Sequence, residues 1–156
     1  MAIEVGEVAP DFTLRDTAGE KVTLSSFRGE KNVVLVFYPA AFSSFCATQL
    51  SEIGESEARY VEGGAQVIGV SVDGVASQER FARDLGLTET ILLSDFLPRG
   101  AVADAYGVFL PDWGTAARAT FVIDRDGVVR ARFLTETPLT IPDQDEYFAT
   151  LAACAV

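Results

Sequence analysis

The segment Val33–Tyr38 is apolar at six consecutive positions, and this run limits the possible folds more than any other feature. A strand that is apolar on both faces needs cover on both, as central strands of α/β sheets have. Pro39 ends the run, and apolar residues then recur at helical spacing from about Ser43 to Val61. A second buried strand is predicted at Gln66–Val72. Strand, helix and strand with short joints predict a parallel right-handed crossover.

The flanking segments predict a mixed sheet around this unit. The further predicted elements are an N-terminal hairpin of Pro10–Leu14 and Lys21–Leu24, helices at Ala76–Leu85, Gly100–Tyr106 and Asp143–Ala153, a strand at Ile91–Leu93, and a hairpin of Ala119–Asp124 and Val128–Phe133. We therefore predict an α/β, thioredoxin-like fold, in which helices flank a central mixed sheet with an N-terminal β-hairpin extension. The 156 residues are expected to form a single domain, 1–156.

Charge and cysteine content restrict the partners. The chain carries 23 acidic and 12 basic side chains, a net charge of −11, which argues against binding nucleic acid or anionic membranes. The N-terminus lacks the basic and apolar regions of a signal peptide, and no apolar run reaches the length of a membrane span. Two cysteines without export signals predict reduced thiols and a cytoplasmic location.

The absence of histidine excludes several kinds of site. Cysteine and serine hydrolases lose their usual general base, and zinc or haem loses its usual imidazole ligand. Two cysteines are too few for a four-thiolate zinc site. We therefore expect no metal and no cofactor.

Cys46 is the strongest candidate for a reactive group. It follows the first buried strand and falls near the start of the next helix, where unpaired N–H groups and the helix dipole favour a thiolate. Ser43 precedes it by one helical turn, so its hydroxyl can lie beside the sulfur, and Pro39 stiffens the loop. The alternatives are a buried inert cysteine, a serine that only caps the helix, and a proline that only ends the strand.

The pattern Pro-x-x-x-Ser/Thr-x-x-Cys after a buried strand resembles the active-site motif of the peroxiredoxin family. Pro39, Ser43 and Cys46 match it, although most members have threonine where this chain has Ser43. Similarity extends over nearly the whole chain, and the subgroup it resembles most is the one-cysteine alkyl hydroperoxide reductase E type. The segments that carry this similarity are Ala9–Leu14, Phe37–Ser43, Leu93–Val102, Ala105–Val108 and Arg118–Asp124.

The resemblance implies a thiol-dependent peroxidase whose cysteine becomes a sulfenic acid. Its substrates would be hydrogen peroxide and alkyl hydroperoxides, with peroxynitrite as a further candidate. It selects Arg118 as the arginine beside the thiolate and Gln49 as the residue that orients it, although Gln49 is also compatible with a solvated helix position. It also implies a homodimer, with Phe42 and Phe109 as candidate contacts, and reduction by an external thiol or a thioredoxin- or glutaredoxin-like protein.

The second cysteine, Cys154, is either a resolving cysteine or a packing residue. It follows Tyr147 by seven residues and Leu151 by three, an apolar stripe that favours packing. Ser51 stands where some peroxiredoxins carry a resolving cysteine, and we expect a one-cysteine cycle with no resolving residue.

Two rival functions use the same cysteine. A thioredoxin-type disulfide oxidoreductase needs Cys-x-x-Cys, and Ser43 occupies its first position, which disables dithiol exchange. A peroxide sensor or redox relay would pass oxidation from Cys46 to a partner protein. Sustained consumption of peroxide with added reductant separates an enzyme from a sensor.

Overall fold

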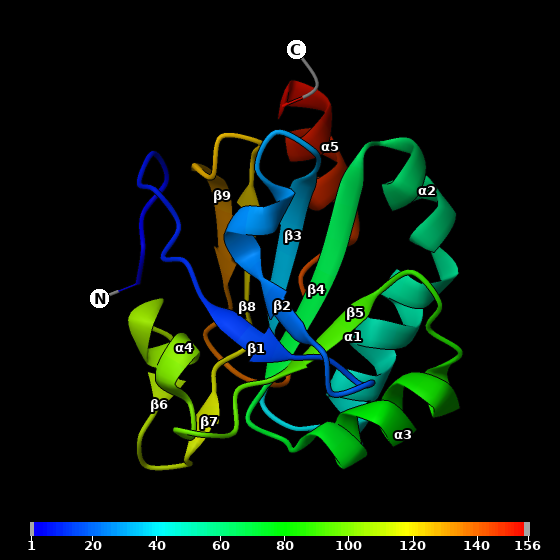
Figure 1. The fold of residues 1–156 in the computed structure, drawn as a ribbon, viewed down its shortest axis with the longest axis vertical. Helices are drawn as coiled ribbons and strands as arrows, with labels where there is room; N and C mark the ends of the chain where they lie inside the picture. Colours follow the sequence, from blue (N-terminus) through cyan, green and yellow to red (C-terminus); the bar gives the residue numbers. More distant parts are fainter. Residues whose placement is uncertain (1, 155–156) are drawn as a thin grey trace.

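The computed structural model describes residues 2–154, which form a mixed sheet covered on both faces (Figure 1). The seven strands lie in the order β2-β1-β5-β4-β3-β8-β9, and β6 and β7 form a separate pair. The strands are β1 (Thr13–Arg15), β2 (Lys21–Thr23), β3 (Asn32–Phe37), β4 (Ala65–Ser71), β5 (Ile91–Ser94), β6 (Phe109–Leu110), β7 (Thr115–Ala116), β8 (Ala119–Ile123) and β9 (Val129–Leu134). The helices are α1 (Ser44–Glu55), α2 (Glu57–Glu62), α3 (Val75–Leu85), α4 (Ala101–Ala105) and α5 (Gln144–Cys154), with a 3₁₀ turn at Leu24–Phe27.

The apolar run Val33–Tyr38 contains most of the central strand β3, which pairs with β4 in parallel and with β8 antiparallel. Its side chains alternate between two cores. Val33, Leu35 and Phe37 pack on the face covered by α4 and the 3₁₀ turn, whereas Val34 and Val36 pack on the face covered by α1, α2, α3 and α5. The prediction of a thioredoxin-like sheet with an N-terminal hairpin is confirmed, because β1 and β2 pair and β1 joins β5.

The prediction of one helix from Ser43 to Val61 is wrong. The helix breaks at Ser56, whose backbone has φ −107° and ψ 9°, and α2 begins at the next residue. The break brings the Glu57 carboxylate to the loop before β5, where it accepts from the backbone N–H groups of Thr88, Glu89 and Thr90 at 3.1, 2.9 and 2.6 Å. The carboxylate thus ties α2 to the loop that follows α3.

The hairpin of β6 and β7 was not predicted. Each strand has two residues, too few to reveal an alternating pattern. Trp113 lies in the turn between them and its side chain is 78% exposed. Within residues 2–154, each helix is too short or too polar to cross a bilayer.

Glu57 makes the stability of the protein depend on pH. Burial alone would raise the pKa of Glu57, but its hydrogen bonds to Thr88, Glu89 and Thr90 outweigh burial and hold the pKa below its usual value. A lowered native pKa stabilises the fold above the unfolded value of about 4.3, and this contribution is lost as the pH falls through the native pKa. We expect Glu57→Gln to lower the free energy of unfolding by about 2 kcal/mol at neutral pH.

Urea unfolding at neutral and acid pH measures this contribution. The difference between the parent and Glu57→Gln should shrink as the pH falls below about 4, because the parent then also loses its carboxylate. Glu55→Gln, at an exposed position of α1, is the matched control. A difference that does not change with pH would contradict the role assigned to the Glu57 charge.

Candidate active site

Cys46 lies in the first turn of α1 and is fully buried, with 0% of its surface exposed. Ser43 is the N-cap residue, and the first helical hydrogen bond runs from the Ala47 N–H to the Ser43 carbonyl at 2.9 Å. The Cys46 N–H therefore has no partner within the helix. The Ser43 side chain does not cap this turn. A buried thiol and a free backbone donor consequently lie at the same helix terminus.

Arg118 meets Cys46 because of strand register. Ala119, the first residue of β8, pairs with Phe37, the last residue of β3. Arg118 therefore lies beside the loop that leads from β3 into α1. Its Nη2 donates to Cys46 Sγ at 3.3 Å, and only 2% of the residue is exposed. Burial of both groups makes this contact stronger than the same contact in water.

The Arg118 guanidinium is held by neutral acceptors. Nη1 donates to Gln49 Oε1 at 2.6 Å, while Nε and Nη2 both donate to the Pro138 carbonyl at 3.0 and 2.8 Å. No carboxylate of residues 2–154 forms a salt bridge with Arg118. Among residues 2–154 its hydrogen-bond acceptors are the Gln49 amide oxygen, the Pro138 carbonyl and the Cys46 sulfur, and of these only the sulfur can carry a negative charge.

Gln49 is buried rather than solvated. It lies one turn after Cys46 on α1 and directs its carbonyl oxygen to Arg118. Its Nε2 has no hydrogen-bond partner among residues 2–154. The structure thus brings Cys46, Arg118 and Gln49 together.

Ser43 and Pro39 lie in the loop between β3 and α1. The Ser43 hydroxyl donates to the Ala40 carbonyl at 3.0 Å, and within residues 2–154 it makes no hydrogen bond to the sulfur. Pro39 is half-buried, two residues after the end of β3. Phe42 has φ +67°, an uncommon backbone conformation for a side chain of this size, and its ring packs on Phe81. This loop is therefore held by its surroundings rather than by local preference.

Asp73 is an anchor of this loop that the sequence reasoning missed. Its carboxylate accepts from the Ala41 N–H at 2.8 Å and from the Ser71 hydroxyl. Asp73 follows β4, whose end lies beside the end of β3, because Val70 pairs with Phe37. A polar residue just past a buried parallel strand was the available signal, since side chains at these strand ends gather at one edge of the sheet.

A buried polar chain continues from this anchor. Gln78 on α3 donates to the Ser71 hydroxyl at 2.8 Å and to the Leu93 carbonyl at 3.0 Å, and it accepts from the Tyr38 hydroxyl. Burial raises the pKa of Tyr38, so its hydroxyl stays neutral and can donate. Tyr38 belongs to the same apolar cluster as Cys46. This series of hydrogen bonds therefore links the loop to the ends of β3, β4 and β5.

Cys154 lies at the other end of the sheet. It lines a surface hollow with Asp124 and Arg130, and Asp124 follows the end of β8 opposite to Arg118. A strand advances about 3.3 Å per residue, so Arg118 and Asp124 lie roughly 20 Å apart. Figure 1 shows the C-terminal end of α5 at the top, whereas the start of α1 lies at the bottom.

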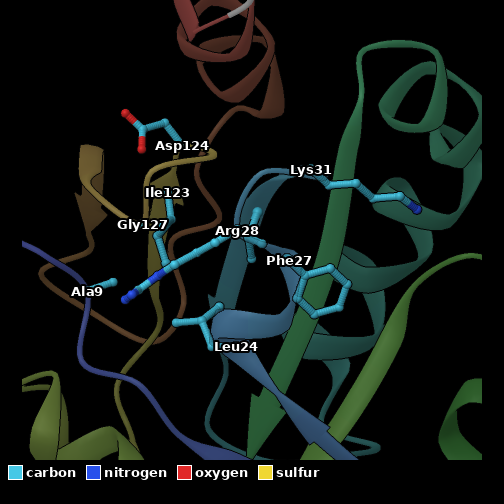
Figure 2. Close-up of a pocket in the computed structure, with 9 residues that line it drawn as sticks. Ala9, Leu24, Phe27, Arg28, Lys31, Ile123, Asp124 and Gly127 are labelled. Atoms are coloured by element: carbon cyan, nitrogen blue, oxygen red, sulfur yellow. The ribbon is translucent and has the colours of Figure 1, made fainter.

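The pocket drawn in Figure 2 is also distant from the thiol. Asp124, Ile123 and Gly127 line it with Arg28, at the end of β8 far from Arg118. The space it encloses is that of about one water molecule. Nor does the described part of the chain, residues 2–154, bring together three cysteine, aspartate or glutamate side chains that could hold a metal ion.

Comparison with known sequences agrees on one family. The model of the AhpC/TSA family matches residues 5–132. Alkyl hydroperoxide reductase E of Mycobacterium tuberculosis is 40% identical over 151 residues, which cover 97% of both chains. The chloroplastic peroxiredoxin Q of Triticum aestivum is 40% identical over 129 residues, covering 82% of this chain and 58% of that relative.

Comparison with solved structures gives the same result. Peroxidoxin BcpB from Mycobacterium tuberculosis superposes with a TM-score of 0.86 at 32% identity and 97% coverage of each chain. A peroxiredoxin-like protein from Aquifex aeolicus has a TM-score of 0.88 at 24% identity, covering 99% of this chain and 89% of that one. The second match supports the fold alone.

Proposed function

This chain belongs to the AhpC/TSA family, which includes the peroxiredoxins, and from that premise we propose that Cys46 is the sulfur with which it reduces hydroperoxides. Thiol-dependent peroxide reduction is the activity of the family. The observation that supports this assignment best is the buried contact between Arg118 Nη2 and Cys46 Sγ at 3.3 Å. A guanidinium in that position stabilises a thiolate. Four of its five N–H groups donate to Gln49, Pro138 and Cys46, which leaves one on Nη1 for a substrate oxygen.

The reaction is a displacement at oxygen. The Cys46 thiolate attacks the terminal oxygen of ROOH with an electron pair, an S–O bond forms, and the O–O bond breaks. The leaving alkoxide takes a proton and departs as ROH, while the cysteine remains as Cys–SOH, the reversible first stage of thiol oxidation. We propose hydrogen peroxide and alkyl hydroperoxides as substrates, with peroxynitrite as a further candidate.

Ionisation of the thiol is not sufficient for a fast peroxidase. An ordinary cysteine is about 3% thiolate at neutral pH, so complete ionisation gains roughly 30-fold. Lowering a thiol pKa by about two units also reduces its nucleophilicity roughly tenfold. The two effects leave a net gain of about threefold, so most of the acceleration must come from donors directed at the peroxide.

We propose that three donors at the helix terminus supply that acceleration. Arg118 donates to the sulfur and the Cys46 N–H has no partner within the helix, so both can stabilise the charge that moves onto the leaving oxygen. Ser43 contributes its hydroxyl in our proposal, after exchanging its present bond to Ala40 for one to the substrate. Gln49 orients Arg118, and Pro39 limits the access of water.

We expect Arg118→Ala to lower the second-order rate constant of Cys46 with hydrogen peroxide by about 10²- to 10³-fold, the usual loss of a preorganised charge donor. Stopped-flow measurement on the reduced protein gives this constant, with Cys46→Ser as the blank. Arg80→Ala is the matched control, because Arg80 pairs with Asp84 on the exposed surface of α3. An Arg118→Ala protein that reacts at the parent rate would end the assignment.

The position of Cys154 supports a one-cysteine cycle. It lies at the opposite end of the sheet from Cys46, so the two sulfurs cannot meet within one chain without large rearrangement. Burial also raises the pKa of the Cys154 thiol, which makes it a poor nucleophile at neutral pH. We propose that an external thiol or a thioredoxin- or glutaredoxin-like protein reduces the sulfenic acid.

One equivalent of peroxide should add a single oxygen atom to Cys46 and leave Cys154 as a free thiol. Mass spectrometry of the intact protein, under non-reducing conditions with rapid trapping of sulfenic acid, checks this outcome. Cys154→Ser should keep the parent rate of turnover with an added thiol. A Cys46–Cys154 disulfide in most molecules, within or between chains, would refute the one-cysteine cycle.

We also propose a homodimer in the cytoplasm. Phe42, one of the two expected contact residues, is 52% exposed beside the site, whereas Phe109 on β6 is partly buried. The exposed Phe42 ring therefore supports the dimer more than Phe109 does. Light scattering at micromolar concentration measures the oligomeric state.

A further inference from the structure

The loop between β9 and α5 holds the Arg118 guanidinium through a main-chain carbonyl. The Pro138 carbonyl accepts two of its N–H groups, Nε at 3.0 Å and Nη2 at 2.8 Å. Nη2 is also the group that donates to Cys46 Sγ. A main-chain carbonyl fixes the guanidinium plane without adding a negative charge, so the cation remains available to the thiolate.

The same loop is tied to Arg118 at a second point. Thr135 directly follows β9, and its hydroxyl lies within hydrogen-bond distance of the Arg118 carbonyl at 3.2 Å and the Thr137 carbonyl at 2.9 Å. One hydroxyl proton is therefore shared between the start of β8 and the loop. The loop is shaped further by Thr137, whose hydroxyl accepts from the Leu139 N–H at 3.2 Å.

We propose that Thr135 is a positioning residue for the peroxidase reaction. Its hydroxyl sets the path of the loop Thr135–Thr140, and that path places the Pro138 carbonyl where it directs Arg118 at Cys46. This inference rests on the proposed function, since it assigns Thr135 a role through the arginine assumed to stabilise the reacting oxygens. It adds a residue with no contact to the sulfur and no place in the Pro-x-x-x-Ser-x-x-Cys motif.

Arg118 has a long side chain, whose conformational freedom must be restricted before it can act as a donor. An arginine side chain carries about 2 kcal/mol of rotamer entropy, and a donor helps a transition state only where it is already in position. Gln49 holds Nη1 from the side of α1, and the Pro138 carbonyl holds Nε and Nη2 from the other side. Without the Pro138 carbonyl, only Gln49 and the Cys46 sulfur hold the guanidinium, and two of its buried N–H groups lose their acceptor.

Thr135→Val and Thr135→Ser test the proposal as a matched pair. Valine keeps the shape of threonine without the hydroxyl, whereas serine keeps the hydroxyl without the methyl group. For each protein, the rate of Cys46 with hydrogen peroxide is divided by its rate with iodoacetamide, taken per thiolate from the pH profile of alkylation. Iodoacetamide reports the thiolate but does not need a donor for a leaving oxygen.

We expect Thr135→Val to lower this ratio about tenfold and Thr135→Ser to keep it within about twofold of the parent. Thr135→Ala makes the same comparison where valine is not accommodated. A parent-like ratio in both Thr135→Val and Thr135→Ala would overturn the proposal, as would an equal loss in the valine and serine variants.

Arg118→Ala, measured in the same way, separates a failure of the role proposed for Thr135 from a failure of the role proposed for Arg118. A low ratio in Arg118→Ala together with parent-like ratios in both Thr135→Val and Thr135→Ala refutes the role of Thr135 and leaves the proposed function intact. A parent-like ratio in Arg118→Ala refutes the role of the arginine itself.

Discussion

The structure is organised around a buried positive charge that contacts one sulfur. Arg118 and Cys46 are 72 residues apart in the sequence, and their side chains meet at 3.3 Å with both residues out of water. A guanidinium in this environment carries a desolvation cost that a carboxylate would ordinarily offset. Here its recorded acceptors are an amide, a main-chain carbonyl and the thiol. In our proposal this cation stabilises the Cys46 thiolate, and the one N–H group left on Nη1 can donate to a reacting oxygen.

The fold creates this contact through the sheet edge at which β3, β4 and β8 meet. The pairing of Phe37 with Ala119 and Val70 fixes where the β3 loop, Arg118 and the segment after β4 lie. Asp73 then holds the loop through the Ala41 N–H. The 3.3 Å contact thus depends on strand register first and on loop anchors second, and its geometry is built before any substrate arrives. Such preorganisation is what an electrostatic donor needs.

Much of this could be predicted from the sequence, for identifiable reasons. Six apolar residues in β3 require a doubly covered strand, and a cysteine one loop later must fall at a helix start. Arg118 could be identified only through the family resemblance, because nothing in the sequence around it separates it from the other arginines. The break at Ser56 and the Pro138 carbonyl were not predictable. Serine is not a helix breaker, and a main-chain acceptor has no side-chain signal, so each depends on tertiary contacts of distant segments.

The central claim is that donors directed at the peroxide, rather than ionisation alone, make Cys46 a peroxidase. The most direct measurement compares the parent protein with free cysteine, each as its thiolate, in reactions with hydrogen peroxide and iodoacetamide. The account predicts that the preference of Cys46 for peroxide exceeds that of free cysteine by at least about a hundredfold. An equal preference in the two thiolates would contradict it, because the sulfur would then be only an ionised cysteine.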